Sequence, residues 1–124
     1  MSVEVRRLSD VVAFFGAPEY KKIDVEGFDS VCLRDLDLRG IRPNYLSAEA
    51  HTLETFCHLV AMGYREFKMV SGGRVATDFA QHPITLLDGG SVQFQFKFHS
   101  AGPFGEDIPG DWTGPDDILE QWLK

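Results

Sequence analysis

The chain has 124 residues, of which 44% are hydrophobic and 25% are charged, the composition of an ordinary folded protein. Its formal net charge of −7, with Lys and Arg scattered along the sequence, argues against nucleic-acid binding, because phosphate contacts need concentrated positive charge. The longest apolar run, residues 11–15, is too short to cross a bilayer, and the amino terminus has no apolar signal-peptide segment. We therefore expect a cytoplasmic protein, a single domain over residues 1–124, and no membrane or nucleic-acid partner.

Helical and extended patterns alternate along the first half of the chain. Residues 8–15 carry apolar side chains at i, i+3, i+4 and i+7, which predicts a helix that ends before Gly16 and Pro18. By the same reasoning we expect a strand at residues 20–23, a helix at 28–38, a strand at 43–49 and a helix at 52–62. Strands that alternate with helices predict crossover connections and a mainly parallel sheet.

The second half begins with a predicted strand at residues 64–70, which leads into a long Gly-rich loop at 72–90. From Val92 to Phe98 apolar residues alternate with polar ones, which predicts an antiparallel strand with one buried face. A last helix is expected to begin at Pro115. The expected fold is thus α/β, with a sheet of about four strands, mostly parallel with one antiparallel strand, flanked by helices.

Cys32 and Cys57 occupy apolar positions in the predicted helices. In the helix at 52–62, the apolar side chains Leu53, Phe56, Cys57 and Val60 share one face and are expected to point into the core. The pattern therefore predicts two reduced, buried thiols.

Acidic side chains follow two of the predicted strands. Asp24 and Glu26 come directly after the strand at 20–23, and Glu49 and His51 follow the strand at 43–49. Because the carboxyl ends of parallel strands meet at one edge of a sheet, we expect these side chains to converge. They could orient a substrate hydroxyl or amine, or hold a divalent cation through carboxylate oxygens. The structural alternative is that Asp24 and Glu26 only stabilise the turn and the start of the next helix.

Residues 15–35, FGAPEYKKIDVEGFDSVCLRD, resemble the FkbM-type family of S-adenosylmethionine-dependent methyltransferases, in which a KIDVEG segment forms the fourth strand and its turn. PNYLSAEA at 43–50 resembles the fifth strand with its terminal Glu, and GYREFKMV at 63–70 resembles the sixth. SAGPFGEDIPGDW at 100–112 is similar to the closing loop of one branch of the family. The resemblance covers nearly the whole chain in the family's order, and it implies a partial class I methyltransferase (Rossmann-like) sheet.

The resemblance also implies S-adenosylmethionine as cofactor and an oxygen of a sugar or small metabolite as methyl acceptor. It implies catalytic roles for Asp24, Glu26 and Glu49, and it places Asp24 and Gly27 beside the cofactor. Phe104 and Glu106 are expected to contact the substrate, together with His51 of the strand edge.

The sequence departs from the family in one respect. The family holds the cofactor mainly through a Gly-rich turn after its first strand, whereas here 23 residues precede Asp24 and the Gly pairs at 72–73 and 89–90 lie in the late loop. We therefore expect the chain to correspond to the carboxy-terminal half of the fold and to bind the cofactor poorly alone. The strand at Tyr20–Ile23 would then have an unpaired edge, which predicts a homo-oligomer or a separate amino-terminal half as partner. The alternative is a non-enzymatic module that dimerises or binds a partner.

Overall fold

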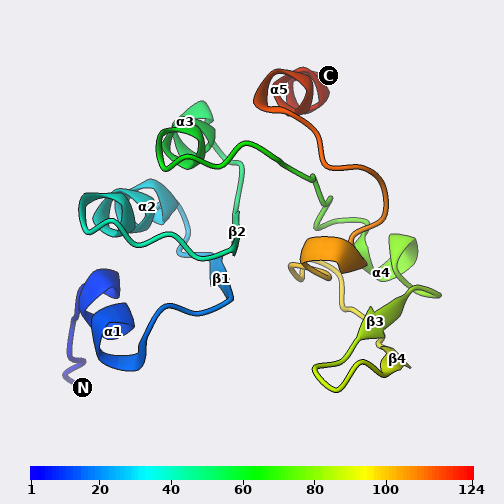
Figure 1. Cartoon of the computed structure of the whole chain (residues 1–124), viewed down its shortest axis with the longest axis horizontal. Helices are drawn as coiled ribbons and strands as arrows, with labels where there is room; N and C mark the ends of the chain where they lie inside the picture. The colour runs from blue at the N-terminus through cyan, green and yellow to red at the C-terminus, as the bar shows by residue number, and fades with distance from the viewer. The chain divides into compact units, whose positions relative to one another are not determined.

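A computed structural model describes all 124 residues (Figure 1). The expected single domain is divided into two compact groups of contacts, unit 1 at Met1–Tyr64 and unit 2 at Arg65–Lys124. Each unit combines helices with one pair of strands, so the predicted mixed α/β class is confirmed. None of the helices has both the length and the apolar character that a bilayer crossing requires.

Unit 1 contains the five elements that the sequence predicts, with ends that differ by at most a few residues. They are α1 (Leu8–Phe15), β1 (Tyr20–Ile23), α2 (Asp29–Leu38), β2 (Tyr45–Ala48) and α3 (Leu53–Ala61). The strands β1 and β2 pair in parallel, and α2 is the connection between them. Figure 1 shows α1, α2 and α3 on the same side of this strand pair.

The core of unit 1 lies between these helices and one face of the strand pair. Helix α2 contacts both α1 and α3, and its Leu33 and Leu36 are fully buried. Ile23 of β1 packs into the same cluster, and Leu46 and Ala48 of β2 border it. Hydrophobic burial against α2 therefore fixes which face of the two strands points inward.

Two hydrogen bonds tie segments of unit 1 that lie far apart in the sequence. The backbone N–H of Ser9 in α1 donates to Asp35 of α2 at 2.8 Å. The hydroxyl of Tyr64 donates to the carbonyl of Pro43 at 2.6 Å, and burial raises the pKa of Tyr64 to about 12. The phenol therefore remains a donor throughout the neutral range, and this contact closes the end of the unit.

Unit 2 contains α4 (Val75–Asp78), β3 (Pro83–Thr85), β4 (Ser91–Gln93), the 3-10 turn η1 (Gly105–Asp107) and α5 (Pro115–Leu123). The strands β3 and β4 pair in antiparallel fashion. The predicted last helix is confirmed, as is the antiparallel direction of the strand that begins near Val92.

The prediction of one sheet of about four strands is wrong, because the chain has two separate sheets of two strands. Residues 64–70 do not form a strand, since their pairing is limited to a single antiparallel bridge between Phe67 and Thr113. Residues 72–90 are not one loop either, because they include α4 and β3, and Val75 and Phe79 are buried in unit 2.

The predicted strand at 92–98 stops at Gln93. Its partner there is Pro83, which has no backbone N–H to continue the ladder. Beyond that point the rings of Phe94 and Phe96 pack edge to face, with centroids 5.0 Å apart. The expected buried face is also wrong, because Val92, Phe94 and Phe98 are 44%, 56% and 64% exposed.

The thiols and the face of α3 also differ from expectation. Both cysteines are free, but Cys57 is exposed and Cys32 is half-buried. Thr55 of α3 and Met62, which follows the helix, are buried, whereas Leu53 is 49% exposed. The apolar pattern pointed to the wrong face because Thr55, a polar residue, occupies a core position.

A buried lysine organises unit 2. The side chain of Lys68 is 5% exposed and its ammonium lies 3.8 Å from the carboxylate of Glu106. Its Nζ donates to the carbonyl of Ile108 at 2.7 Å and lies 4.5 Å from the ring centroid of Trp112. One cation thus holds residues 105–112 against the segment that precedes α4, since charge-assisted bonds to a desolvated ammonium are strong.

We predict that Lys68→Met lowers the free energy of unfolding by about 2–3 kcal/mol, because the carbonyl of Ile108 loses its donor and Trp112 loses its cation. Urea denaturation of the full chain measures the change. Lys97→Met is the control, because Lys97 is exposed and the same charge is removed. Equal denaturation midpoints for the two variants would contradict this role of Lys68.

Candidate functional site

The register of the parallel pair brings the predicted site residues of unit 1 to one edge. Ile23 lies opposite Ala48 at the carboxyl ends of β1 and β2. The next residues along the two strands, Asp24 and Glu49, therefore leave the sheet side by side. Of the four side chains expected to converge, the structure brings together Asp24, Glu49 and His51, and with Lys22 they form what we call the rim cluster.

Lys22 is the neighbour that defines the charge state of Asp24. In an extended strand, side chains two residues apart lie on the same face, and the ammonium of Lys22 pairs with the carboxylate of Asp24. This hydrogen bond is the main cause of a lowered pKa for Asp24, and the charge of Lys22 adds to it. The same hydrogen bond raises the pKa of Lys22. Asp24 is thereby held as a carboxylate, which accepts hydrogen bonds and is a weak base.

The second strand end contributes a carboxylate–imidazole pair. His51 Nε2 lies 2.7 Å from Glu49 Oε2, and both side chains are about half exposed. Because an ionised carboxylate only accepts hydrogen bonds, Nε2 carries the hydrogen in this pair. The lone pair of a neutral His51 is then on Nδ1, the other ring nitrogen, and Glu49 fixes the orientation of the ring.

Glu26 and Gly27 form the turn between β1 and α2. The N–H of Phe28 donates to the carbonyl of Val25 at 3.2 Å, and the two central residues have φ of +49° and +91°. Two positive φ values are the signature of a type I′ turn, which explains the glycine and places Glu26 in the left-handed region. Glu26 stands exposed on this turn, and no group of three His, Cys, Asp or Glu side chains is placed to hold a metal ion. The three acids of the divalent-cation alternative, Asp24, Glu26 and Glu49, therefore do not form a ligand group in this structure.

Asp29 connects the ends of the two strands and is a residue that the sequence analysis did not single out. It is the first residue of α2 and is 2% exposed. One carboxylate oxygen accepts from the N–H of Val25 and the other from the N–H of Glu49, both at 3.4 Å. These bonds are long, but the group is buried and reaches the turn after each strand. The sequence carried one signal for this role, an acid at the start of a helix that follows a strand, where it can accept hydrogen bonds from backbone N–H groups.

The closing-loop residues lie in unit 2. Glu106 pairs with Lys68 and accepts a hydrogen bond from the indole N–H of Trp112 at 2.8 Å. Phe104 precedes η1 and is 42% exposed. The contacts of Glu106 hold the loop in place, and the substrate contact expected of both residues stays a prediction.

The rim cluster places an anionic acceptor, a cation and an oriented imidazole on one accessible edge. This set can receive hydrogen bonds from hydroxyl or amine groups and can accept a proton. No protein-family model, curated protein or solved structure matches the chain.

We predict that Lys22→Met raises the pKa of Asp24 toward the ordinary value for an aspartate, because the main cause of its depression is removed. Titration of the Asp24 carboxyl carbon by NMR measures this. In the wild-type chain the midpoint is expected below the ordinary aspartate value. Lys97→Met should leave the Asp24 titration unchanged, and an equal rise in both variants would show that net charge alone is responsible.

Proposed function

We propose that the chain forms the acceptor-binding side of an S-adenosylmethionine-dependent methyltransferase of the FkbM type, acting on an oxygen of a sugar or small metabolite. The observation that supports this proposal is the convergence of Asp24, Glu49 and His51 at the carboxyl ends of two adjacent parallel strands. Ligands of open α/β sheets bind at this edge. The resemblance of residues 15–35 and 43–50 to that family supplies the class of reaction, and the finer Rossmann-like topology is part of the same proposal.

The rim cluster suits a hydroxyl acceptor. Asp24, held ionised by Lys22, would accept the hydrogen bond of the hydroxyl and orient its oxygen. A group with a depressed pKa is a poor base, so the proton would pass to Nδ1 of His51, the side-chain type that most often serves as general base. Glu49 would hold the ring and stabilise the imidazolium that forms.

The turns of unit 1 do not suit the carboxylate of the cofactor's methionine end, whereas the ammonium of that end could pair with their acids. Both strand-to-helix turns carry acids, Asp24 and Glu26 in one and Glu49 in the other, and these would repel a carboxylate. Gly27 has open space where a Cβ would stand, so no close approach to the backbone requires a glycine there. A carboxylate can accept hydrogen bonds from hydroxyl groups, so the expected contact of Asp24 with the cofactor would be to the ribose hydroxyls of the cofactor.

The function predicts binding of a sugar through the rim cluster. Saturation-transfer NMR with a panel of methyl glycosides and free monosaccharides should find at least one ligand of the wild-type chain. Asp24→Asn and Glu49→Gln should each lower the affinity for that sugar about tenfold, because a charge-assisted hydrogen bond is lost.

Asp116→Asn, an exposed acid in the first turn of α5, is the matched control and should bind as the wild type does. If no sugar in the panel binds, or if Asp24→Asn and Asp116→Asn bind equally well, the acceptor site is not at the rim cluster. Transfer of a labelled methyl group to the bound sugar, measured after adding S-adenosylmethionine, tests the reaction class separately.

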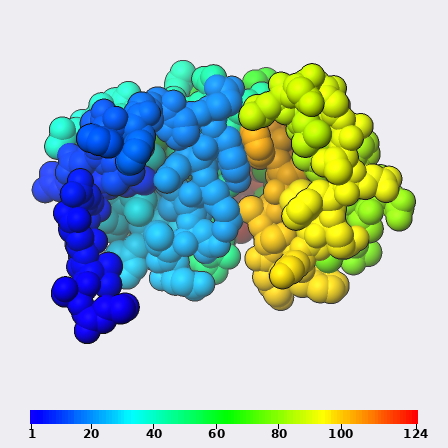
Figure 2. All heavy atoms as spheres, turned by 90° about the horizontal axis from the view of Figure 1, so that it is seen from below, coloured from blue at the N-terminus to red at the C-terminus, as the bar shows by residue number.

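A non-enzymatic, partner-binding role is favoured by a different observation. Apolar side chains stand exposed on the β3–β4 hairpin and after it, at Leu86, Leu87, Val92, Phe94 and Phe98. Figure 2 shows this yellow segment on the surface of unit 2. In unit 1, β1 has β2 as its one partner strand, in keeping with the proposed association through Tyr20–Ile23. A light-scattering mass of two chains that Phe94→Ser reduces to one would favour association through the hairpin.

A further inference from the structure

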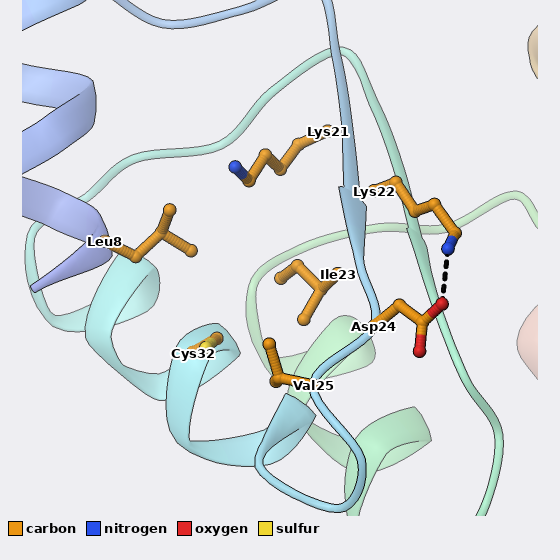
Figure 3. A pocket seen from close by; sticks show the side chains of 7 residues that line it. All are labelled: Leu8, Lys21, Lys22, Ile23, Asp24, Val25 and Cys32. Atoms are coloured by element: carbon orange, nitrogen blue, oxygen red, sulfur yellow. Dashed lines mark hydrogen bonds and ion pairs between the residues drawn. The ribbon is translucent and has the colours of Figure 1, made fainter. Parts of the chain in front are cut away.

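A hollow of about 320 Å³ opens on unit 1 beside β1 and is bordered by α1 and α2 (Figure 3). Its floor is apolar. It consists of Leu8 from α1, Ile23 from β1, Cys32 from α2, and Val25 from the turn between β1 and α2. This volume lies at the lower end of the range for small-molecule sites, about 300–1,000 Å³. Lys22 and Asp24 of the rim cluster also line the hollow, where they pair with each other, whereas Glu49 and His51 do not line it.

Lys21 is the unusual residue of this hollow. It lies opposite Leu46 in the parallel register, on the face of β1 that also carries the buried Ile23 and is covered by the helices. A lysine on a covered face is expected to be paired or to reach water. Figure 3 shows its side chain extending over the hollow, whereas that of Lys22 points away to Asp24.

The nearby carboxylates do not neutralise Lys21. Asp29 and Asp35 lie close enough to affect the thiol of Cys32, as does Lys21 itself. However, Asp29 accepts the N–H groups of Val25 and Glu49, and Asp35 accepts that of Ser9. None of the ion pairs of the chain includes Lys21. The acid that lines the hollow, Asp24, pairs with Lys22. The hollow therefore combines an apolar floor with a half-buried cation, Lys21, that belongs to no ion pair.

We propose that this hollow binds a small monocarboxylate with a linear apolar tail. The carboxylate would pair with the ammonium of Lys21, and the tail would lie over Leu8, Ile23 and Val25 and remove their surface from water. The charge complementarity is local, because the chain as a whole carries a net charge of −7 and repels anions. The hollow borders the rim cluster at Asp24 and Lys22, but carboxylate binding by Lys21 does not depend on the proposed methyl transfer.

Octanoate is the probe, and calorimetry with the full chain is the measurement. Octanoate should bind, whereas octylamine, with the same tail and the opposite charge, should not bind measurably. Lys21→Met should lower the affinity for octanoate about tenfold, which corresponds to about 1.4 kcal/mol of binding free energy. The control Lys97→Met, at an exposed position, should leave this affinity unchanged. Absence of octanoate binding at millimolar concentration, or equal binding of octylamine, would overturn the proposal.

Cys32 provides a second readout that needs no substitution. Burial is the main cause of a raised pKa for this thiol. It should therefore react slowly with iodoacetamide, because the thiolate is the form that attacks this reagent and displaces its iodide. The exposed Cys57 is the internal reference in the same molecule. Octanoate should slow alkylation of Cys32 several-fold and leave Cys57 unchanged, as measured by peptide mass spectrometry. Equal rates at Cys32 with and without saturating octanoate would place any binding elsewhere and refute this site.

Discussion

The register of the β1–β2 ladder, fixed from beneath by the carboxylate of Asp29, is the constraint on which the account of the site depends. The register brings Ile23 and Ala48 opposite one another, so the acidic residues that follow them leave the sheet together. Asp29 then accepts the backbone N–H after each strand. A shift of one residue would exchange the inward and outward faces of a strand and bury Lys22 in place of Ile23. The apolar contacts of Leu33 and Leu36 therefore determine indirectly which polar groups reach the rim.

The two units use buried ions in complementary ways. In unit 1 an anion, Asp29, receives backbone donors from two turns, and in unit 2 a cation, Lys68, donates to backbone carbonyls of a loop. Both arrangements satisfy peptide groups of turns and loops, which have no ladder partners. Burial of an ion without such partners would cost several kcal/mol, on the order of the total stability of a small domain. The exposed rim cluster differs, because its charges remain in contact with water and so stay available to a ligand.

The sequence predicted unit 1 well, because each of its elements has its own period and its own terminating residue, such as Gly16 after α1. It also predicted that Asp24, Glu49 and His51 converge, which follows from parallel pairing alone. It failed in unit 2, where alternation from Val92 to Phe98 indicated a half-buried strand that tertiary contacts do not supply. Pro83 ends the ladder, and no layer covers Phe94. Lys22, Asp29 and Lys68 were missed because their roles depend on partners that local patterns do not name.

Amide hydrogen exchange in Asp29→Ala measures the central constraint most directly. Removing the carboxylate leaves two backbone donors without an acceptor, which should cost about 1–3 kcal/mol. We expect the amides of Val25 and Glu49 to exchange at least several-fold faster than in the wild type. Substitution of Asp37, an exposed acid on the same helix, by Ala should leave both rates unchanged. Unchanged protection of both amides in Asp29→Ala would show that the strand ends are held together without this carboxylate, and it would contradict the account.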